Sequence, residues 1–253
     1  MLRLIVAILG LMLALPAMAA TYVALPGGSF TSVLPADGKT AAAQVAPFRL
    51  RTELVTNGEF LAFVKTRPQW QRDKVASILA DARYLTQWRA ATDLGDSVLP
   101  LQPVTRVSWF AAQAFCESEQ ARLPSWHEWE FAAAADATRR DARKDAAWRE
   151  EILGWYARPS NSALPSVGGS PNIYGARDMN GLVWEWVDDF NALMVASDSR
   201  NQGDPDLLKF CGAGAISLQQ KENYAVLMRI AMLSALRAAD TTNNMGFRCA
   251  KPE

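Results

Sequence analysis

The chain of 253 residues contains a single histidine, His127, and this scarcity limits the chemistry that it can carry. A metal site with several imidazole ligands is excluded, because such a site needs more than one histidine. We interpret His127 as a structural residue. Because histidine is the usual general base in hydrolysis, most hydrolytic mechanisms would lack that base in this protein.

The chain also lacks an excess of charge of either sign. Lysine and arginine together number 26, and aspartate and glutamate together also number 26. Binding to nucleic acid or to an anionic membrane surface depends on a positive excess, so the composition favours neither.

Long hydrophobic runs are absent after the first residues of the chain. Residues 1–19, MLRLIVAILGLMLALPAMA, combine Arg3, an apolar run and an Ala-Met-Ala cleavage motif, which indicates a signal peptide cleaved after Ala19. The run is shorter than the roughly 20 apolar residues that span a membrane. We therefore expect a periplasmic protein with no transmembrane anchor after cleavage.

Residues 20–253 are long enough for one domain with a sizeable core, and no linker divides them. Nine tryptophans, with glycine and proline scattered throughout, favour a loop-rich domain with short elements over a helical bundle. We expect the charged residues 69–96 to be helical in tendency and to lie at the surface. Residues 132–151, which are rich in alanine and charge, should continue or restart a helix.

Three helix starts can be predicted from capping chemistry. Thr56 or Asn57 precedes an amphipathic stretch, and Ser108 precedes another helix. Ser125 is followed three residues later by Glu128, which is the pattern of a capping box.

Residues 172–190, NIYGARDMNGLVWEWVDDF, combine turn-forming glycines with carboxylates. Oxygen ligands are available from Asp178, Asn180 and Glu185. Gly175 and Gly181 permit sharp turns, and the exposed carbonyls of such turns suit a hard cation such as calcium. The alternative is a turn followed by a plain core strand that buries its two tryptophans on one face.

This segment resembles the Asp-Met-x-Gly-Asn-Val-Trp-Glu-Trp motif of the formylglycine-generating enzyme family, also called the sulfatase-modifying-factor family. Two other stretches, ARLPSWHEWEFAA and NMGFRCA, resemble further motifs of that family in the same order. The resemblance extends from Tyr22 to Ala250. It implies a compact, loop-rich α+β fold that is related to C-type lectins and forms a single domain.

The resemblance also implies a structural calcium ion as the cofactor. Its ligands would be the side chains of Asp178 and Glu185 and the backbone carbonyls of Gly181 and Val183. Leu182 replaces an asparagine that is usual in the family, but it is not a ligand position.

The sequence contains three cysteines, Cys116, Cys211 and Cys249. In an oxidising compartment two of them should pair, and their spacing alone allows three pairings. The resemblance implies a disulfide between Cys116 and Cys249, which leaves Cys211 as a free thiol.

Enzymes of the family use two cysteines separated by four residues to bind the copper that oxidises a substrate cysteine to formylglycine. Counting forward from Cys211 places Ser217 and Glu222 at those positions, and counting back from the last cysteine places Gln220 and Ala225 there. Neither alignment restores a thiol pair, and thiolates are the ligands that suit Cu(I). We therefore expect neither bound copper nor formylglycine-generating activity.

Three functions remain as hypotheses. The first is a periplasmic accessory protein that assists the maturation or function of a partner enzyme, with a copper nitrite reductase as the candidate partner. The second is an oxidoreductase that uses the cleft differently, with Trp184, Ser217, Glu222 and Cys211 as candidate catalytic residues. The third is a lectin-like binding module.

Overall fold

The structure is a computed structural model that describes residues 20–32, 42–158, 163–191 and 224–253. Its strands are short: β1 (Tyr22–Leu25), β2 (Gly28–Thr31), β3 (Ala42–Val45), β4 (Phe48–Arg51), β5 (Trp184–Glu185), β6 (Met245–Gly246) and β7 (Ala250–Pro252). The helices are α1 (Asn57–Thr66), the 3-10 turn η1 (Pro68–Trp70), α2 (Trp109–Ser118), α3 (Trp126–Ala133), α4 (Ala146–Tyr156) and α6 (Tyr224–Ser234).

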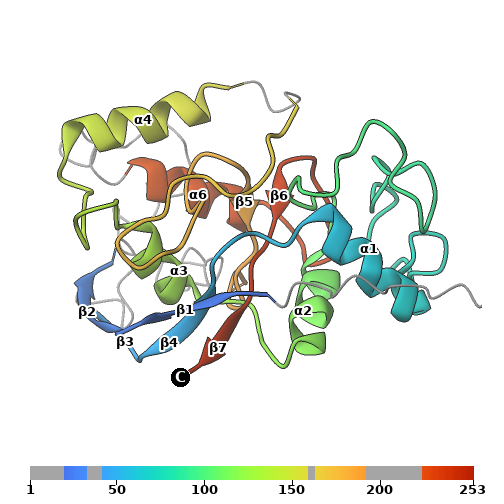
Figure 1. Cartoon of the computed structure of the whole chain (residues 1–253), viewed down its shortest axis with the longest axis horizontal. Helices are drawn as coiled ribbons and strands as arrows, with labels where there is room; N and C mark the ends of the chain where they lie inside the picture. Colours follow the sequence, from blue (N-terminus) through green and yellow to red (C-terminus); the bar gives the residue numbers. More distant parts are fainter. Residues whose placement is uncertain (1–19, 33–41, 159–162, 192–223) are drawn as a thin grey trace, which may run out of the picture.

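The described strands form three small sheets. Antiparallel β1, β4 and β7 make one sheet in the order β1-β4-β7, so the last strand pairs with a strand from the start of the chain. Strands β2 and β3 form an antiparallel pair, and β5 and β6 form a parallel one. Figure 1 shows α1 and α2 on one side and α3, α4 and α6 on the other, with β5 and β6 between the two groups and β2 and β3 at the outer edge beside α3. The result is a mixed α/β single domain.

The predicted helix starts are confirmed. Thr56 caps α1 and Ser125 caps α3, each within a complete capping box, and Ser108 accepts a hydrogen bond from the third backbone amide of α2. These side chains satisfy backbone amides that have no partner within their helices. The local sequence is therefore sufficient to fix where the three helices begin.

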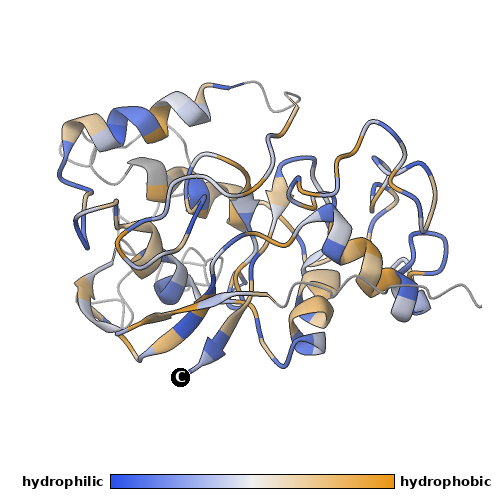
Figure 2. Cartoon of the chain, in the orientation of Figure 1, coloured by the Kyte–Doolittle hydropathy of each residue, from blue (hydrophilic) through white to orange (hydrophobic). Residues whose placement is uncertain are grey.

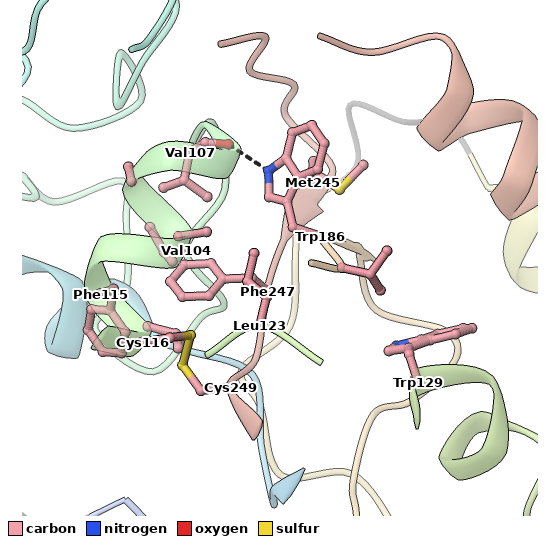
Figure 3. Packing of buried hydrophobic residues seen from close by; sticks show 14 of the residues in the cluster. Val104, Val107, Phe115, Cys116, Leu123, Trp129, Trp186, Met245, Phe247 and Cys249 are labelled. Carbon is pink, nitrogen blue, oxygen red and sulfur yellow. Dashed lines mark hydrogen bonds between the residues drawn. A yellow bond between two sulfur atoms is a disulfide. The ribbon is translucent and has the colours of Figure 1, made fainter. Parts of the chain in front are cut away.

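The core lies between the two groups of helices. In Figure 3, Trp186 lies near the centre, with Phe115 and the disulfide on the side of α2 and Trp129 on the opposite side. Trp186 is fully buried, and its indole Nε1 donates a hydrogen bond of 3.0 Å to the backbone carbonyl of Val107. The second tryptophan of the Trp-Glu-Trp motif is therefore a core residue, as the plain core interpretation of the motif requires.

For residues 69–96 the expected helical tendency is wrong, and the expected surface position holds only in part, because exposed residues alternate with buried ones. After η1 this segment contains turns and no α-helix, and it buries Tyr84, Leu85 and Trp88. The Nε1 of Trp88 donates to Asn57 Oδ1 at 2.9 Å, which fixes the segment against the start of α1. Burial of these large side chains outweighed the helical tendency of the charged residues.

Residues 132–151 restart a helix rather than continue one. α3 ends at Ala133, and α4 begins at Ala146 with Asp145 as its cap. Figure 2 shows both hydrophilic and hydrophobic bands along α4. None of the helices in the described ranges is long and apolar enough to cross a membrane.

Candidate functional site

Glu185 lies in β5 at the centre of the predicted metal site, and its side chain is fully buried. Arg248, which is equally buried, donates from Nε to Glu185 Oε2 at 2.7 Å and from Nη2 to Oε1 at 3.0 Å. An isolated carboxylate in a protein interior costs several kcal/mol, so a buried glutamate requires a partner of this kind. Here the arginine supplies the positive charge.

The short parallel sheet explains why these two residues meet. Glu185 is opposite Gly246 in the pairing of β5 with β6, and Arg248 follows Gly246 by two residues. Residues two apart on an extended chain point to the same side. Arg248 therefore reaches across to Glu185, although the two residues are 63 positions apart.

Arg248 also fixes the turn that precedes β5. Its Nη2 donates to the backbone carbonyl of Asp178 at 3.2 Å, and its Nη1 donates to the carbonyl of Thr52 at the same distance. Asp178 has a φ of 53° and Gly181 has a φ of 99°. Both lie in the left-handed region, which aspartate and glycine adopt more readily than most residues, so the predicted sharp turn is present.

The carboxylate of Asp178 already has partners. Its Oδ2 accepts a hydrogen bond from the backbone amide of Gly168 at 2.8 Å, and its Oδ1 accepts one from the amide of Gly169 at 3.1 Å. A Cβ on Gly169 would lie 2.3 Å from Asp178 Oδ1, so the absence of a side chain there permits this approach. Asp178 thus holds the loop around residue 168 against the turn.

The donor set fits a hard cation by its chemistry, because it combines two carboxylates with two backbone carbonyls. Within the described ranges, however, no three His, Cys, Asp or Glu residues gather as a metal-binding cluster. Calcium bound through Asp178 would share that carboxylate with the amides of Gly168 and Gly169, since each carboxylate oxygen has two lone pairs. The ion therefore stays a prediction.

Trp184, the first tryptophan of the motif, is half-buried in a cluster of aromatic rings. Its ring centroid lies 5.2 Å from that of Trp155 and 5.0 Å from that of Tyr156, both at the end of α4. The backbone carbonyl of Glu185, the next residue, accepts a hydrogen bond from Arg229 of α6. The candidate catalytic residue Trp184 therefore lies where α4 and β5 meet.

The structure does not test the other three candidate catalytic residues. Cys211, Ser217 and Glu222 lie outside the described residues. His127 lies in α3, where its ring is 6.2 Å from that of Phe30.

The predicted disulfide is confirmed. Cys116 in α2 is bonded to Cys249, the residue before β7, with their Cα atoms 5.4 Å apart and both residues fully buried. The bond joins the middle of the chain to its last strand across 133 positions.

Residues 11–253 match the family described as the sulfatase-modifying factor enzyme 1-like domain, or FGE-sulfatase. The chain belongs to this family. The formylglycine-generating enzyme of Streptomyces coelicolor is 29% identical over 282 residues, which cover 90% of this chain and 88% of that enzyme.

Two other proteins that are similar to this chain are not named as formylglycine-generating enzymes with activity. The inactive C-alpha-formylglycine-generating enzyme 2 of Mus musculus is 29% identical over 270 residues, covering 89% of this chain and 84% of that protein. The hercynine oxygenase of Mycobacterium tuberculosis is 31% identical over 160 residues, covering 56% of this chain and 38% of that protein. The solved structure of PvdO from Pseudomonas aeruginosa superposes with a TM-score of 0.50 at 21% identity, covering 92% of this chain and 94% of that one, which supports the fold.

Sequence reasoning missed the two arginines of the site, Arg248 and Arg229. A signal for Arg248 was available, because a glutamate between two tryptophans of a core strand needs a cationic partner. Arg248 lies in the quoted motif NMGFRCA, where an arginine stands between buried apolar residues. No comparable local pattern indicated Arg229.

Proposed function

We propose that this family member is a periplasmic accessory protein that assists the maturation or function of a partner enzyme and does not make formylglycine. A copper nitrite reductase is the partner to test first. The protein reaches the periplasm through the signal peptide of residues 1–19, which lie outside the described residues.

The observation that carries this proposal is the use of the cysteines. The sequence has three, and the disulfide between Cys116 and Cys249 consumes two of them. Cys211 is the one remaining thiol, whereas the copper route of the family uses a pair of thiolates. A single thiolate is a poor Cu(I) site, so the known reaction lacks its metal ligands.

The relatives support a function without catalysis. A protein named as an inactive formylglycine-generating enzyme matches 89% of this chain, so the family includes members that bear the fold and are described as inactive. We also propose the finer relation of this fold to C-type lectins, which the resemblance of the motifs implies.

Deletion of the gene tests the accessory role. Activity and copper content of the periplasmic nitrite reductase should fall in the deletion strain and recover when the intact chain is supplied in trans. A matched strain supplied with the chain lacking residues 1–19 should not recover, because that product stays in the cytoplasm. Unchanged activity and copper content in the deletion strain would remove the proposal.

A direct assay tests the absence of formylglycine formation. The purified mature protein should leave the cysteine of a sulfatase-derived peptide unmodified in the presence of oxygen and Cu(I), under conditions in which the Streptomyces coelicolor enzyme converts it. Copper and calcium should be measured separately in the same preparation. Copper at one ion per chain would overturn the argument from the cysteines.

An oxidoreductase is the second candidate, and the position of Trp184 favours it. A half-buried ring packed with Trp155 and Tyr156 offers an aromatic surface to a substrate. A relative named hercynine oxygenase indicates that this fold also serves other oxidations. Oxygen consumption with hercynine or with a cysteine peptide, lost in Trp184→Ala, would replace the accessory role with this one.

A further inference from the structure

A groove of about 270 Å³ lies between the turn that follows α1 and the second half of α2. These two helices lie together on one side of the molecule (Figure 1), and Phe63 of α1 packs on Phe115 of α2 with ring centroids 5.3 Å apart. The side chains that line the groove are Arg67, Gln69, Trp70, Ala114, Glu117 and Ser118. The volume far exceeds the roughly 10–15 Å³ that one water molecule needs, so the groove can hold a small organic molecule.

The aromatic wall of the groove is held in place by its backbone. The amide of Trp70 donates to the carbonyl of Arg67 at 3.0 Å, and the carbonyl of Trp70 accepts a hydrogen bond from Tyr84 Oη, also at 3.0 Å. The indole is half-buried, because part of it packs on the core. On the side of α2, Ala114 contributes only a methyl group to the lining. The groove therefore offers a fixed apolar surface with open space beside it.

The groove also carries one charge of each sign, and the two charges do not neutralise each other directly. Arg67 and Glu117 are both exposed, and in the part of the chain that the structure describes neither has a salt-bridge partner within 4.0 Å. Glu117 Oε1 accepts a hydrogen bond from Gln113 Nε2 at 3.1 Å, which orients the carboxylate and leaves Oε2 open. A ligand that carries only one charge would therefore meet one group of its own sign, whereas a ligand with both charges can pair with each.

We propose that this groove binds a free α-amino acid with an apolar side chain. The carboxylate of the ligand accepts hydrogen bonds from the guanidinium of Arg67, whose planar shape suits a carboxylate. The ammonium group pairs with Glu117, and the apolar side chain lies on the indole of Trp70. The proposal is independent of the accessory role, because these residues are neither calcium ligands nor cysteines.

The test uses the purified mature protein and ligands that differ chiefly in charge. L-leucine carries both charges, N-acetyl-L-leucine keeps only the carboxylate, and L-leucinamide keeps only the ammonium group. Each is titrated at about pH 6, where these groups are charged, and at constant ionic strength. Binding is followed through the indole N–H resonance of Trp70, which is the signal that disappears in Trp70→Phe. Leucine should bind roughly two- to fivefold more tightly than either analogue, as expected for the loss of one exposed ion pair.

Two variants separate the two charges. Glu117→Gln should weaken the binding of leucine by roughly two- to fivefold without weakening that of N-acetyl-leucine, which has no ammonium group. Arg67→Gln should weaken the binding of leucine by a similar factor without weakening that of leucinamide, which has no carboxylate. Arg237→Gln is the matched control, because that side chain is 85% exposed and does not line the groove, so it should bind all the ligands as the unmodified protein does.

Three results would overturn the site. The first is an indole resonance of Trp70 that does not move with leucine up to its limit of solubility. The second is an equal affinity for leucine and for both analogues, which would mean that the two charges take no part in binding. The third is an equal loss of affinity for all the ligands in Arg67→Gln or Glu117→Gln, which is what a change in the shape of the groove would produce.

Discussion

Removal of Arg248 is the substitution from which we expect the largest loss of stability. Arg248→Met keeps an unbranched side chain of similar length but leaves Glu185 buried without a counter-charge. The backbone carbonyls of Asp178 and Thr52 also lose the donor that they share. Breaking a buried ion pair in this way costs about 3–5 kcal/mol.

That cost can be converted into a melting temperature. For a domain of 150–250 residues, each kcal/mol lowers the midpoint by about 2–4 °C, so Arg248→Met should melt roughly 6–20 °C below the unmodified protein. Glu185→Leu should lose a similar amount, since it leaves the arginine unpaired. The double variant should recover much of the loss, because two apolar side chains can replace a buried pair at little cost.

Urea denaturation at pH 7 with the disulfide intact is the assay, with the free energy of unfolding taken from the midpoint at unchanged slope. Arg237→Met is the control, because the Arg237 side chain of the pair with Asp240 is 85% exposed, so that its loss should cost less than about 1 kcal/mol. The reasoning fails if Arg248→Met lies within about 1 kcal/mol of the unmodified protein. It also fails if the two single losses simply add in the double variant.

Three further predictions concern the disulfide, calcium and pH. Replacing Cys116 and Cys249 by alanine should lower the free energy of unfolding by about 4–5 kcal/mol in the chain-entropy model; peptide mapping that links the third cysteine to either one would contradict the pairing. Calcium at a hundredfold its dissociation constant should stabilise the protein by about 2.7 kcal/mol, in thermal melts with and without chelator, and Asp178→Ala should abolish the effect. Burial raises the pKa of Asp189, so its contribution to stability is present at low pH and is lost as the pH rises through the folded-state pKa. Asp189→Asn should therefore stabilise the protein more at pH 7 than at pH 3 in urea; an equal effect at the two pH values would contradict the prediction.

Features that depend on a few neighbouring residues could be predicted from the sequence. The caps at Thr56, Ser108 and Ser125 are of this kind, because the capping side chain and the amide that it accepts from are only three residues apart. The disulfide is different, since spacing left three pairings open and only the resemblance of the flanking motifs selected one.

Features that depend on distant partners could not be predicted in the same way. The segment of residues 69–96 is charged enough to suggest a surface helix, but Trp88 finds Asn57 as a hydrogen-bond partner 31 positions earlier. Arg229 and Trp129 are a second example, because nothing in the local sequence of either residue indicates that they stack. In both cases tertiary packing decides the structure, and local propensity is a weak guide.

The pair of Arg248 with Glu185 also determines how the calcium prediction must be tested. Each carboxylate oxygen has two lone pairs, and Arg248 occupies one on each oxygen of Glu185, so the arginine and an ion are not mutually exclusive on this side chain. Glu185→Ala would nevertheless destabilise the protein with or without calcium, because it leaves a buried guanidinium unpaired. Its melting temperature alone therefore says little about the ion. Asp178→Ala removes a ligand and two hydrogen bonds from loop amides but leaves the buried pair intact, so a calcium response that disappears in this variant identifies the ion's site.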